Sequence, residues 1–160
     1  MNKWVIFQWA PVYWSKLDGD ETTLTYGSEE YQQIAFEVRR VICNYSKPIG
    51  RIVRIQNVFD LAQCLVRGQL LTTASPMVPL FRVRRFIKIH KDHLPAALQW
   101  NLDHRRCNNS ETVFKELIPS NDFSPGEILL VVQVLTQNPH AAEIRPNTTL
   151  EYFIDYVVYF

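Results

Sequence analysis

Cysteine and glycine are both scarce in this sequence. The three cysteines, Cys43, Cys64 and Cys107, are odd in number, lie far apart and form no Cys-x-x-Cys pair. A disulfide framework is therefore not expected, and this cysteine usage is typical of a reducing compartment. Only five of the 160 residues are glycine, which leaves few positions where the backbone could wrap a phosphate group. We expect an intracellular protein, in the nucleus or the cytoplasm.

Strong net charge and long apolar runs are absent as well. Lysine and arginine number 17 against 16 aspartates and glutamates, so the formal net charge is +1 and any nucleic acid must bind a local patch. No apolar run approaches the roughly 20 residues of a membrane-spanning helix. The run Trp4–Tyr13 is interrupted by Gln8 and Pro11 and lacks the cleavage site of a signal peptide. We expect no contact with a membrane.

Length and composition favour one folded domain over residues 1–160. Hydrophobic residues make up 47% of the chain and charged residues 21%, which is typical of globular proteins and excludes disordered and coiled-coil chains. A chain of this size is close to the roughly 150 residues of one domain.

The first half of the chain shows two helical patterns around a short strand. Ser28 is a favourable N-cap, and apolar residues at three- and four-residue spacing predict a helix over residues 28–45. Residues 51–56 alternate as in a strand. A second helix is expected to end at Gly68 and to be followed by a surface loop over residues 71–79. Its packed face should consist of Phe59, Leu61, Ala62, Leu65 and Val66.

The second half is dominated by strand patterns. Residues 80–90 alternate apolar and basic side chains, except that Arg85 and Phe86 invert the phase, which predicts one bent strand with a local bulge. A short helix over 94–100 and strands over 128–135 and 151–160 follow. Two helices followed mostly by strands indicate an α+β domain, with helices on one side of a largely antiparallel sheet.

Short motifs in a fixed order accompany these elements. Ser28-Glu-Glu-Tyr31 begins the first helix, Arg54-Ile-Gln-Asn57 ends the next strand, and Asn101-Leu-Asp103 followed by Arg106-Cys107 comes after the third helix. In this order the motifs resemble the catalytic domain of poly(ADP-ribose) polymerases, which has the ADP-ribosyltransferase fold. The resemblance implies N-terminal helices packed on a split, largely antiparallel sheet. It also implies NAD held by a histidine and a tyrosine, and transfer of ADP-ribose to protein or nucleic acid, often with a catalytic glutamate.

The positions that the resemblance assigns to the cofactor hold unsuitable residues. Counting back from Asn101, the family's His-Gly-Thr falls on Ile87, Lys88 and Ile89. Ile87 offers no hydrogen bond to a ribose hydroxyl, and Lys88 replaces a glycine and fills space that the nicotinamide amide needs. Val113 stands where a tyrosine would stack on the nicotinamide. We therefore expect a fold without cofactor and without catalytic residues.

Two further positions leave alternatives open. Asp155 belongs either to the strand of the family's catalytic glutamate, with a side chain one methylene shorter, or to the last strand of the sheet. His90 lies one residue beyond the motif, and such a shift turns a side chain to the opposite face of a strand unless a bulge intervenes. The enzymatic alternative is a divergent mono-ADP-ribosyltransferase that binds NAD and uses His90 and Asp155.

Basic residues concentrate between positions 82 and 106. Seven basic side chains stand there against two acidic ones, a local balance of +5. Such a patch could bind RNA, DNA or an acidic protein, whereas a solvated strand face is the simpler interpretation. The candidate patch consists of Arg82, Arg84, Arg85, Lys88, Lys91, Arg105 and Arg106.

Histidines in the same region have a spacing that occurs in zinc sites. His90, His93, His104 and Cys107 form a His-x2-His and a His-x2-Cys pair separated by ten residues. Zinc sites of this kind usually contain at least two thiolates, and the intervening residues 94–100 indicate a packed helix. We predict no metal.

These observations lead to one preferred hypothesis and two alternatives. The preferred one is a catalytically inactive poly(ADP-ribose) polymerase-like domain that acts as a protein-interaction or scaffold module. By analogy with inactive relatives, it would belong to an antiviral or gene-silencing complex. The alternatives are the NAD-dependent mono-ADP-ribosyltransferase and a nucleic-acid-binding module that uses the basic strand 82–91. The sequence sets no oligomeric state.

Overall fold

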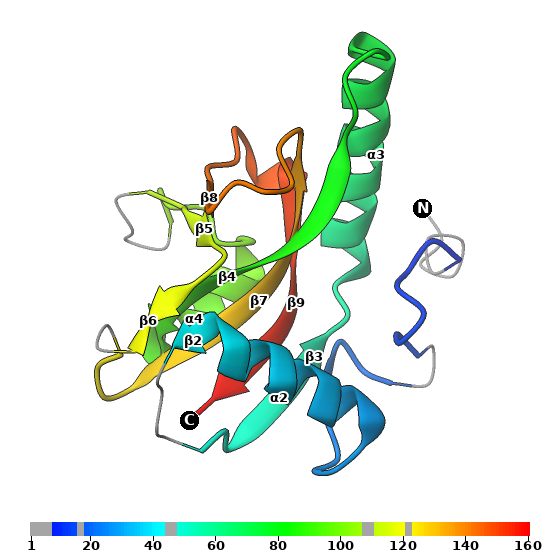
Figure 1. Cartoon of the computed structure of the whole chain (residues 1–160). Helices are drawn as coiled ribbons and strands as arrows, with labels where there is room; N and C mark the ends of the chain where they lie inside the picture. Colours follow the sequence, from blue (N-terminus) through cyan, green and yellow to red (C-terminus); the bar gives the residue numbers. More distant parts are fainter. Residues whose placement is uncertain (1–7, 16–17, 44–47, 107–110, 121–122) are drawn as a thin grey trace.

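A seven-stranded antiparallel sheet forms the centre of the fold (Figure 1). The computed structural model describes residues 8–15, 18–43, 48–106, 111–120 and 123–160. The helices are α2 (Glu29–Val41), α3 (Val58–Ala74) and α4 (Leu94–Gln99), with two 3-10 turns, η1 (Lys91–His93) and η3 (Thr149–Glu151). The strands are β1 (Glu21–Thr23), β2 (Ile42–Cys43), β3 (Arg51–Ile55), β4 (Phe81–His90), β5 (Phe114–Lys115), β6 (Ile118–Pro119), β7 (Glu127–Thr136), β8 (Glu143–Ile144) and β9 (Tyr152–Tyr159).

The order of strands puts the last strand in the middle of the sheet. The order is β1-β3-β9-β7-β4-β5-β8, and β2 and β6 form a separate parallel pair. β9 therefore pairs with β3 on one side and with β7 on the other, and nearly all of its side chains are buried. This confirms the expected mixed α+β class with a mostly antiparallel sheet.

The two N-terminal helices share one face of the sheet, as expected, but α4 covers the opposite face, so the expectation that all helices lie on one side is wrong. α2 packs on the face that carries Ile52, Val131 and Val158, and α3 packs on the same face beside Phe153. α4 covers the opposite face through Ala97. The central strands are apolar on both faces, and each face needs a cover that removes it from water.

Local sequence accounts for where α2 and α3 begin. The Ser28 hydroxyl accepts a hydrogen bond from the Tyr31 amide, and the Asn57 side chain accepts from the amides of Phe59 and Asp60. These caps satisfy backbone donors that the first helical turn leaves open.

α3 does not end at Gly68, and this prediction is corrected. The helix continues to Ala74 and replaces the first part of the expected loop over 71–79. Gly68 lies against the side chains of Leu135 and Leu80, so close packing outweighs the cost of a glycine inside a helix. Figure 1 shows the second half of α3 projecting beyond the sheet beside the start of β4.

The prediction of a bulge in β4 is also wrong. β4 pairs with β7 without interruption from Phe81 to His90. Phe86 lies in the core beneath α2, and Arg85 is buried on the opposite face, so both residues keep the regular alternation. The register shift lies instead between Val131 and Val132, opposite β9, where Asp155 has no partner in the ladder.

None of the helices in the described part of the chain combines the length and the apolar character needed to cross a bilayer.

Candidate functional site

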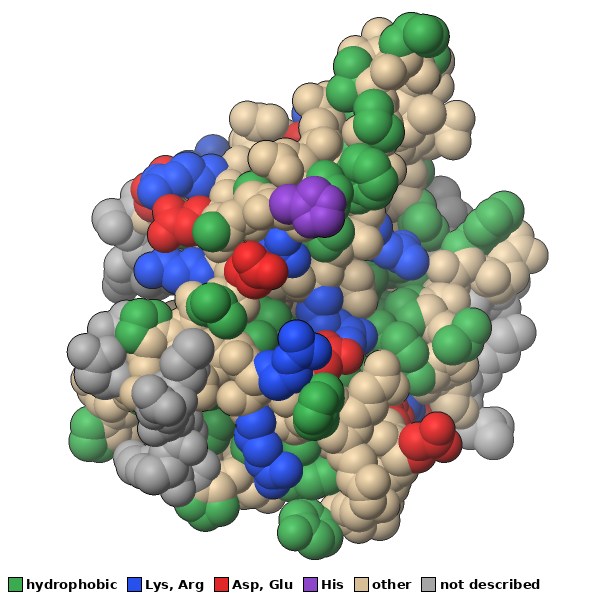
Figure 2. Space-filling model, in the orientation of Figure 1, with side chains coloured by type: hydrophobic (Ala, Val, Ile, Leu, Met, Phe, Trp, Pro, Cys, Tyr) green, Lys and Arg blue, Asp and Glu red, His purple; other side chains and the backbone are tan. Residues whose placement is uncertain are grey.

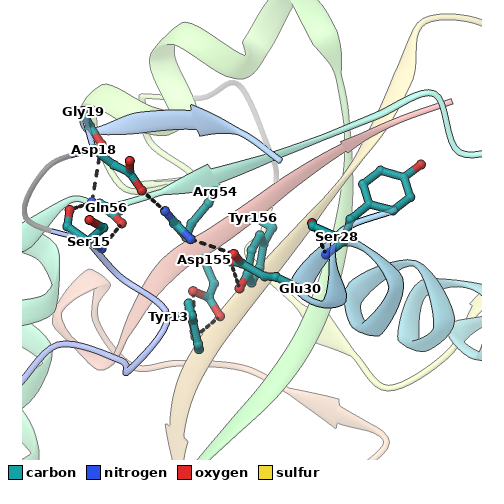
Figure 3. Close-up of polar contacts among 11 residues, drawn as sticks. Tyr13, Ser15, Asp18, Gly19, Ser28, Glu30, Arg54, Gln56, Asp155 and Tyr156 are labelled. Carbon is teal, nitrogen blue, oxygen red and sulfur yellow. Dashed lines mark hydrogen bonds and ion pairs between the residues drawn. The ribbon is translucent and has the colours of Figure 1, made fainter. Parts of the chain in front are cut away.

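A cluster of buried and half-buried polar side chains lies on the sheet face that α2 and α3 cover. We call it the polar cluster. Its members come from the N-terminal segment, α2 and four neighbouring strands, and Figure 3 shows most of them pointing toward one another. They are Tyr13, Glu30, Glu37, Arg54, Arg84, Gln133, Asp155 and Tyr156.

Asp155 is the most deeply buried member of the polar cluster, with 0% of its surface exposed. Its Oδ2 accepts hydrogen bonds from the Tyr13 hydroxyl at 2.7 Å, from Gln133 Nε2 at 3.0 Å and from Arg84 Nη2 at 3.2 Å. The Tyr13 hydroxyl also lies 3.0 Å from Oδ1. The carboxylate is therefore held by donors from three other segments, in agreement with the rule that buried charges are paired.

The irregularity in β9 explains how Asp155 reaches this face. Tyr13 bonds to Asp155 and stacks on the Tyr156 ring, and Arg84 contacts both residues as well. Consecutive residues of a regular strand point to opposite faces, but a bulge turns two neighbours to the same one. The register shift thus adds a carboxylate to a face that Tyr156 already occupies.

Two arginines each bridge a pair of carboxylates. Arg84 binds Asp155 and both oxygens of Glu37, at 2.9 and 2.7 Å. Arg54 binds Asp18 and, at 2.7 Å, Glu30. Each arginine therefore faces two carboxylates, which compete with any added anion for its Nη donors.

Burial and neighbouring charges set the protonation of the polar cluster. Burial raises the pKa of Asp155, although Arg84, Gln133 and Tyr13 act against it. Burial lowers the pKa of Arg84, but Asp155 and Glu37 outweigh this, so the pKa of the guanidinium lies above its ordinary value. Burial and then Asp155 raise the pKa of the Tyr13 and Tyr156 hydroxyls, which therefore remain donors.

The side chains at the predicted cofactor positions have separate surroundings. Ile87 packs against the core on the α4 face of β4. Lys88 lies on the opposite face, where it pairs with Glu127 at 3.1 Å and lies over the Phe123 ring. Val113 is half-buried and directly precedes β5. Because β4 is regular, Ile87 and Lys88 point away from each other.

His90 and Asp155 are far apart. No register shift separates Ile87 from His90, so the histidine lies on the face opposite Ile87. Asp155 contacts Arg84, six residues before His90 on the same strand, which corresponds to roughly 20 Å at about 3.3 Å per residue. His90 instead accepts a hydrogen bond from the Asp92 amide at the end of β4.

The seven basic residues of the candidate patch do not form one surface. Arg84 and Lys88 are ion-paired, and Arg85 is buried, with bonds to the carbonyl oxygens of Pro139 and Ala141. Arg82, at the exposed N-terminal end of β4, lies over the Phe153 ring. Lys91 is exposed in η1. On the face shown in Figure 2, acidic and basic side chains are interspersed.

The last two residues of the patch belong to the segment after α4. Arg105 forms an ion pair with Asp103 at 2.9 Å, and Arg106 lies over the exposed Trp100 ring with its guanidinium carbon 4.1 Å from the ring centroid.

The zinc-like spacing yields no cluster in the described residues. The rings of His90 and His93 lie 6.2 Å apart, and Cys107 falls outside the described residues. Within residues 8–15, 18–43, 48–106, 111–120 and 123–160, no group of three or more His, Cys, Asp or Glu side chains is arranged to hold a metal ion.

The structure reveals a second candidate site on the outer face of α3. Phe59 and Val66, which were expected to pack inward, are 65% and 57% exposed, and Leu70 is 59% exposed. With Ala62 and Leu150 they line a hollow of about 360 Å³, which we call the α3 groove. The i, i+7, i+11 spacing of these three residues is visible in the sequence and places them on one face of a helix. The spacing does not show whether that face points toward the core or toward solvent.

A second hollow, which we call the acidic hollow, adjoins the α3 groove at the N-terminal end of the helix. It measures about 320 Å³ and shares Phe59 with the groove. Its polar walls include the carboxylates of Asp20, Glu21 and Asp60. Burial raises the pKa of Asp60 to about 6.

No protein-family model matches the chain, and no curated protein matches it.

Proposed function

We propose that this chain is a catalytically inactive domain of ADP-ribosyltransferase type that works by binding a protein partner. The observation that carries the proposal is the row of large apolar side chains that α3 exposes at Phe59, Val66 and Leu70. Contiguous exposed apolar surface that lines a hollow is a feature of protein-binding sites.

The state of Asp155 supports the absence of catalysis. A carboxylate that polarises a ribose must reach the substrate, but Asp155 is fully buried and its oxygens accept from Tyr13, Gln133 and Arg84. Ile87 packs against the apolar core and Lys88 pairs with Glu127, so neither side chain is available to hold a ribose hydroxyl.

The engagement of the basic residues argues against nucleic acid as the main partner. Arg84 binds two carboxylates, Arg85 is buried, and Lys88 is paired with Glu127. Salt bridges of this kind compete with phosphate for the same donors. A phosphate-binding strand would instead present several of these side chains on one exposed face.

Two measurements test the proposal. Calorimetric titration with NAD and with a non-hydrolysable analogue should give no saturable heat, and incubation with labelled NAD should modify neither the chain nor added protein. Micromolar NAD binding would contradict the proposal, and labelling that His90→Ala abolishes would instead establish the mono-ADP-ribosyltransferase.

Affinity capture addresses the partner class. The immobilised chain should retain a protein partner after nuclease treatment and in salt that screens phosphate contacts. Capture that nuclease removes, or binding that falls steeply with salt, would identify a nucleic-acid-binding module instead. A chain that retains neither protein nor nucleic acid would contradict the proposal.

A further inference from the structure

The α3 groove and the acidic hollow lie next to each other and differ in chemistry. Phe59 belongs to both hollows. From this residue the apolar part runs along α3 through Val66 to Leu70. Eleven residues of helix at about 1.5 Å each give a length of roughly 16 Å, or about three turns.

Two carboxylates of the acidic hollow, Glu21 and Asp60, face no cation among the described residues. Glu21 is exposed and Asp60 is half-buried, and neither makes an ion pair with a basic side chain of the described residues. Asp60 accepts a hydrogen bond from Asn57 Nδ2 at 2.7 Å, which satisfies one oxygen without neutralising the charge. At the middle of the groove, Arg67 is occupied by the buried Glu151 at 2.9 Å.

We propose that the α3 groove binds an amphipathic helix of a partner protein, with the apolar face of that helix on Phe59, Val66 and Leu70 and a lysine or arginine at the end next to Glu21 and Asp60. This inference rests on the proposed function and names the partner's chemistry. We infer a basic residue at this end of the partner helix from charge complementarity. Its cation would meet the carboxylates of Glu21 and Asp60, which no described basic residue neutralises.

The direction of the bound helix follows from the same charges. The acidic hollow lies at the N-terminal end of α3. Basic side chains favour the C-terminal end of a helix, where the macrodipole is negative. The partner helix therefore runs antiparallel to α3, with its basic residue in its last turn, and about three turns of it contact the groove.

A displayed library of helical peptides tests this inference. Peptides of about four turns, randomised on one face, are selected against the purified chain. Selected sequences should be apolar at helical spacing and carry lysine or arginine in the last turn. Their affinity should fall at least tenfold for Val66→Glu and for Leu70→Glu, both at exposed positions that tolerate a glutamate in the folded helix. Phe36→Glu, at an exposed apolar position on α2, should leave the affinity unchanged.

Neutralising the acidic end separates charge from apolar contact. The double variant Glu21→Gln and Asp60→Asn should weaken peptides with a basic last turn about tenfold and leave peptides without a basic residue unaffected. Thermal unfolding of each variant verifies that the fold is retained.

Several outcomes would overturn the inference. They are a library that yields no binder, binders with acidic last turns, binders that retain full affinity for Val66→Glu and Leu70→Glu, and binding of phosphatidylcholine or phosphatidylserine vesicles that the same two variants abolish. If nuclease-resistant protein capture persists in the two glutamate variants, the proposed function stands and only the α3 groove is excluded. If NAD binds, the proposed function fails whatever the peptides do.

Discussion

The polar cluster predicts a large stability loss when Asp155 is changed to asparagine. The substitution keeps the shape of the side chain but removes its charge at a position with no exposed surface. Three donors then converge on an amide: the Tyr13 hydroxyl, Gln133 Nε2 and Arg84 Nη2. One carbonyl oxygen has two lone pairs, and the new amide group adds two donors that have no acceptor.

The magnitude follows from the unsatisfied groups. At least one of the three donors loses its partner, and the new amide hydrogens are buried without one, each at a cost of about 1–3 kcal/mol. Arg84 keeps both of its bonds to Glu37, so the larger penalty of an isolated buried cation does not apply. We therefore expect Asp155→Asn to lower the free energy of unfolding by about 3 kcal/mol.

Urea denaturation followed by tryptophan fluorescence measures this change. The matched control is Asp92→Asn, because Asp92 is an exposed carboxylate and its loss should change stability by less than about 0.5 kcal/mol. A loss below about 1 kcal/mol for Asp155→Asn, at unchanged slope, would refute the reasoning. It would mean that the carboxyl is already protonated in the fold or that water reaches it.

Three further predictions concern single sites. Burial raises the pKa of Asp60 from its ordinary 3.8 to about 6. The folded chain thus binds that proton more tightly than the unfolded chain, so stability should fall as the pH rises between about 4 and 6. Asp60→Asn should remove this pH dependence and stabilise the chain by about 1 kcal/mol above pH 6. This value allows for the partial exposure of Asp60 and for the loss of a favourable carboxylate in the first helical turn. Urea unfolding at each pH measures the change. Gly126→Ala should cost about 1–2 kcal/mol, because φ is +85° and a Cβ would lie 2.6 Å from His90 Nε2. Adding His90→Ala to this variant should recover only the stability lost to the clash with the histidine ring. If thermal unfolding showed full recovery in the double variant, strain of the backbone at position 126 would be excluded as a cause. Burial raises the pKa of the Cys64 thiol to about 12, so mass spectrometry should find this residue alkylated only after denaturation; rapid labelling of the native chain would contradict its burial.

Much of the fold was accessible from local sequence. The Ser28 cap and the three- and four-residue spacing correctly predicted where α2 begins, but the helix ends at Val41 rather than at residue 45, because β2 follows and pairs with β6. The long strand patterns correctly predicted β4, β7 and β9. These features depend on residues close to one another along the chain. The short strands β1, β2, β5, β6 and β8 were not predicted, because two or three residues give no measurable period and form a strand only when a neighbour pairs with them.

The candidate site was less accessible for the same reason. Asp155 was singled out, but its role as the centre of a buried network depends on Tyr13 and Arg84, 142 and 71 positions away in sequence. Alternation in β4 was visible, yet it could not show that Arg85 is buried against backbone carbonyl oxygens. The strand pattern therefore suggested a basic surface where the fold has a packed interior.

By itself the sequence determined the α+β class, the start of α2 and the position of the central strands, because caps and periodicity act within a few residues. Tertiary structure alone decided which faces are covered. It placed the register shift at Asp155 in β9, extended α3 past Gly68 by packing it against Leu135, and left Phe59 and Val66 exposed. Burial depends on which segments meet across the sheet, and that choice minimises exposed apolar area over the whole chain.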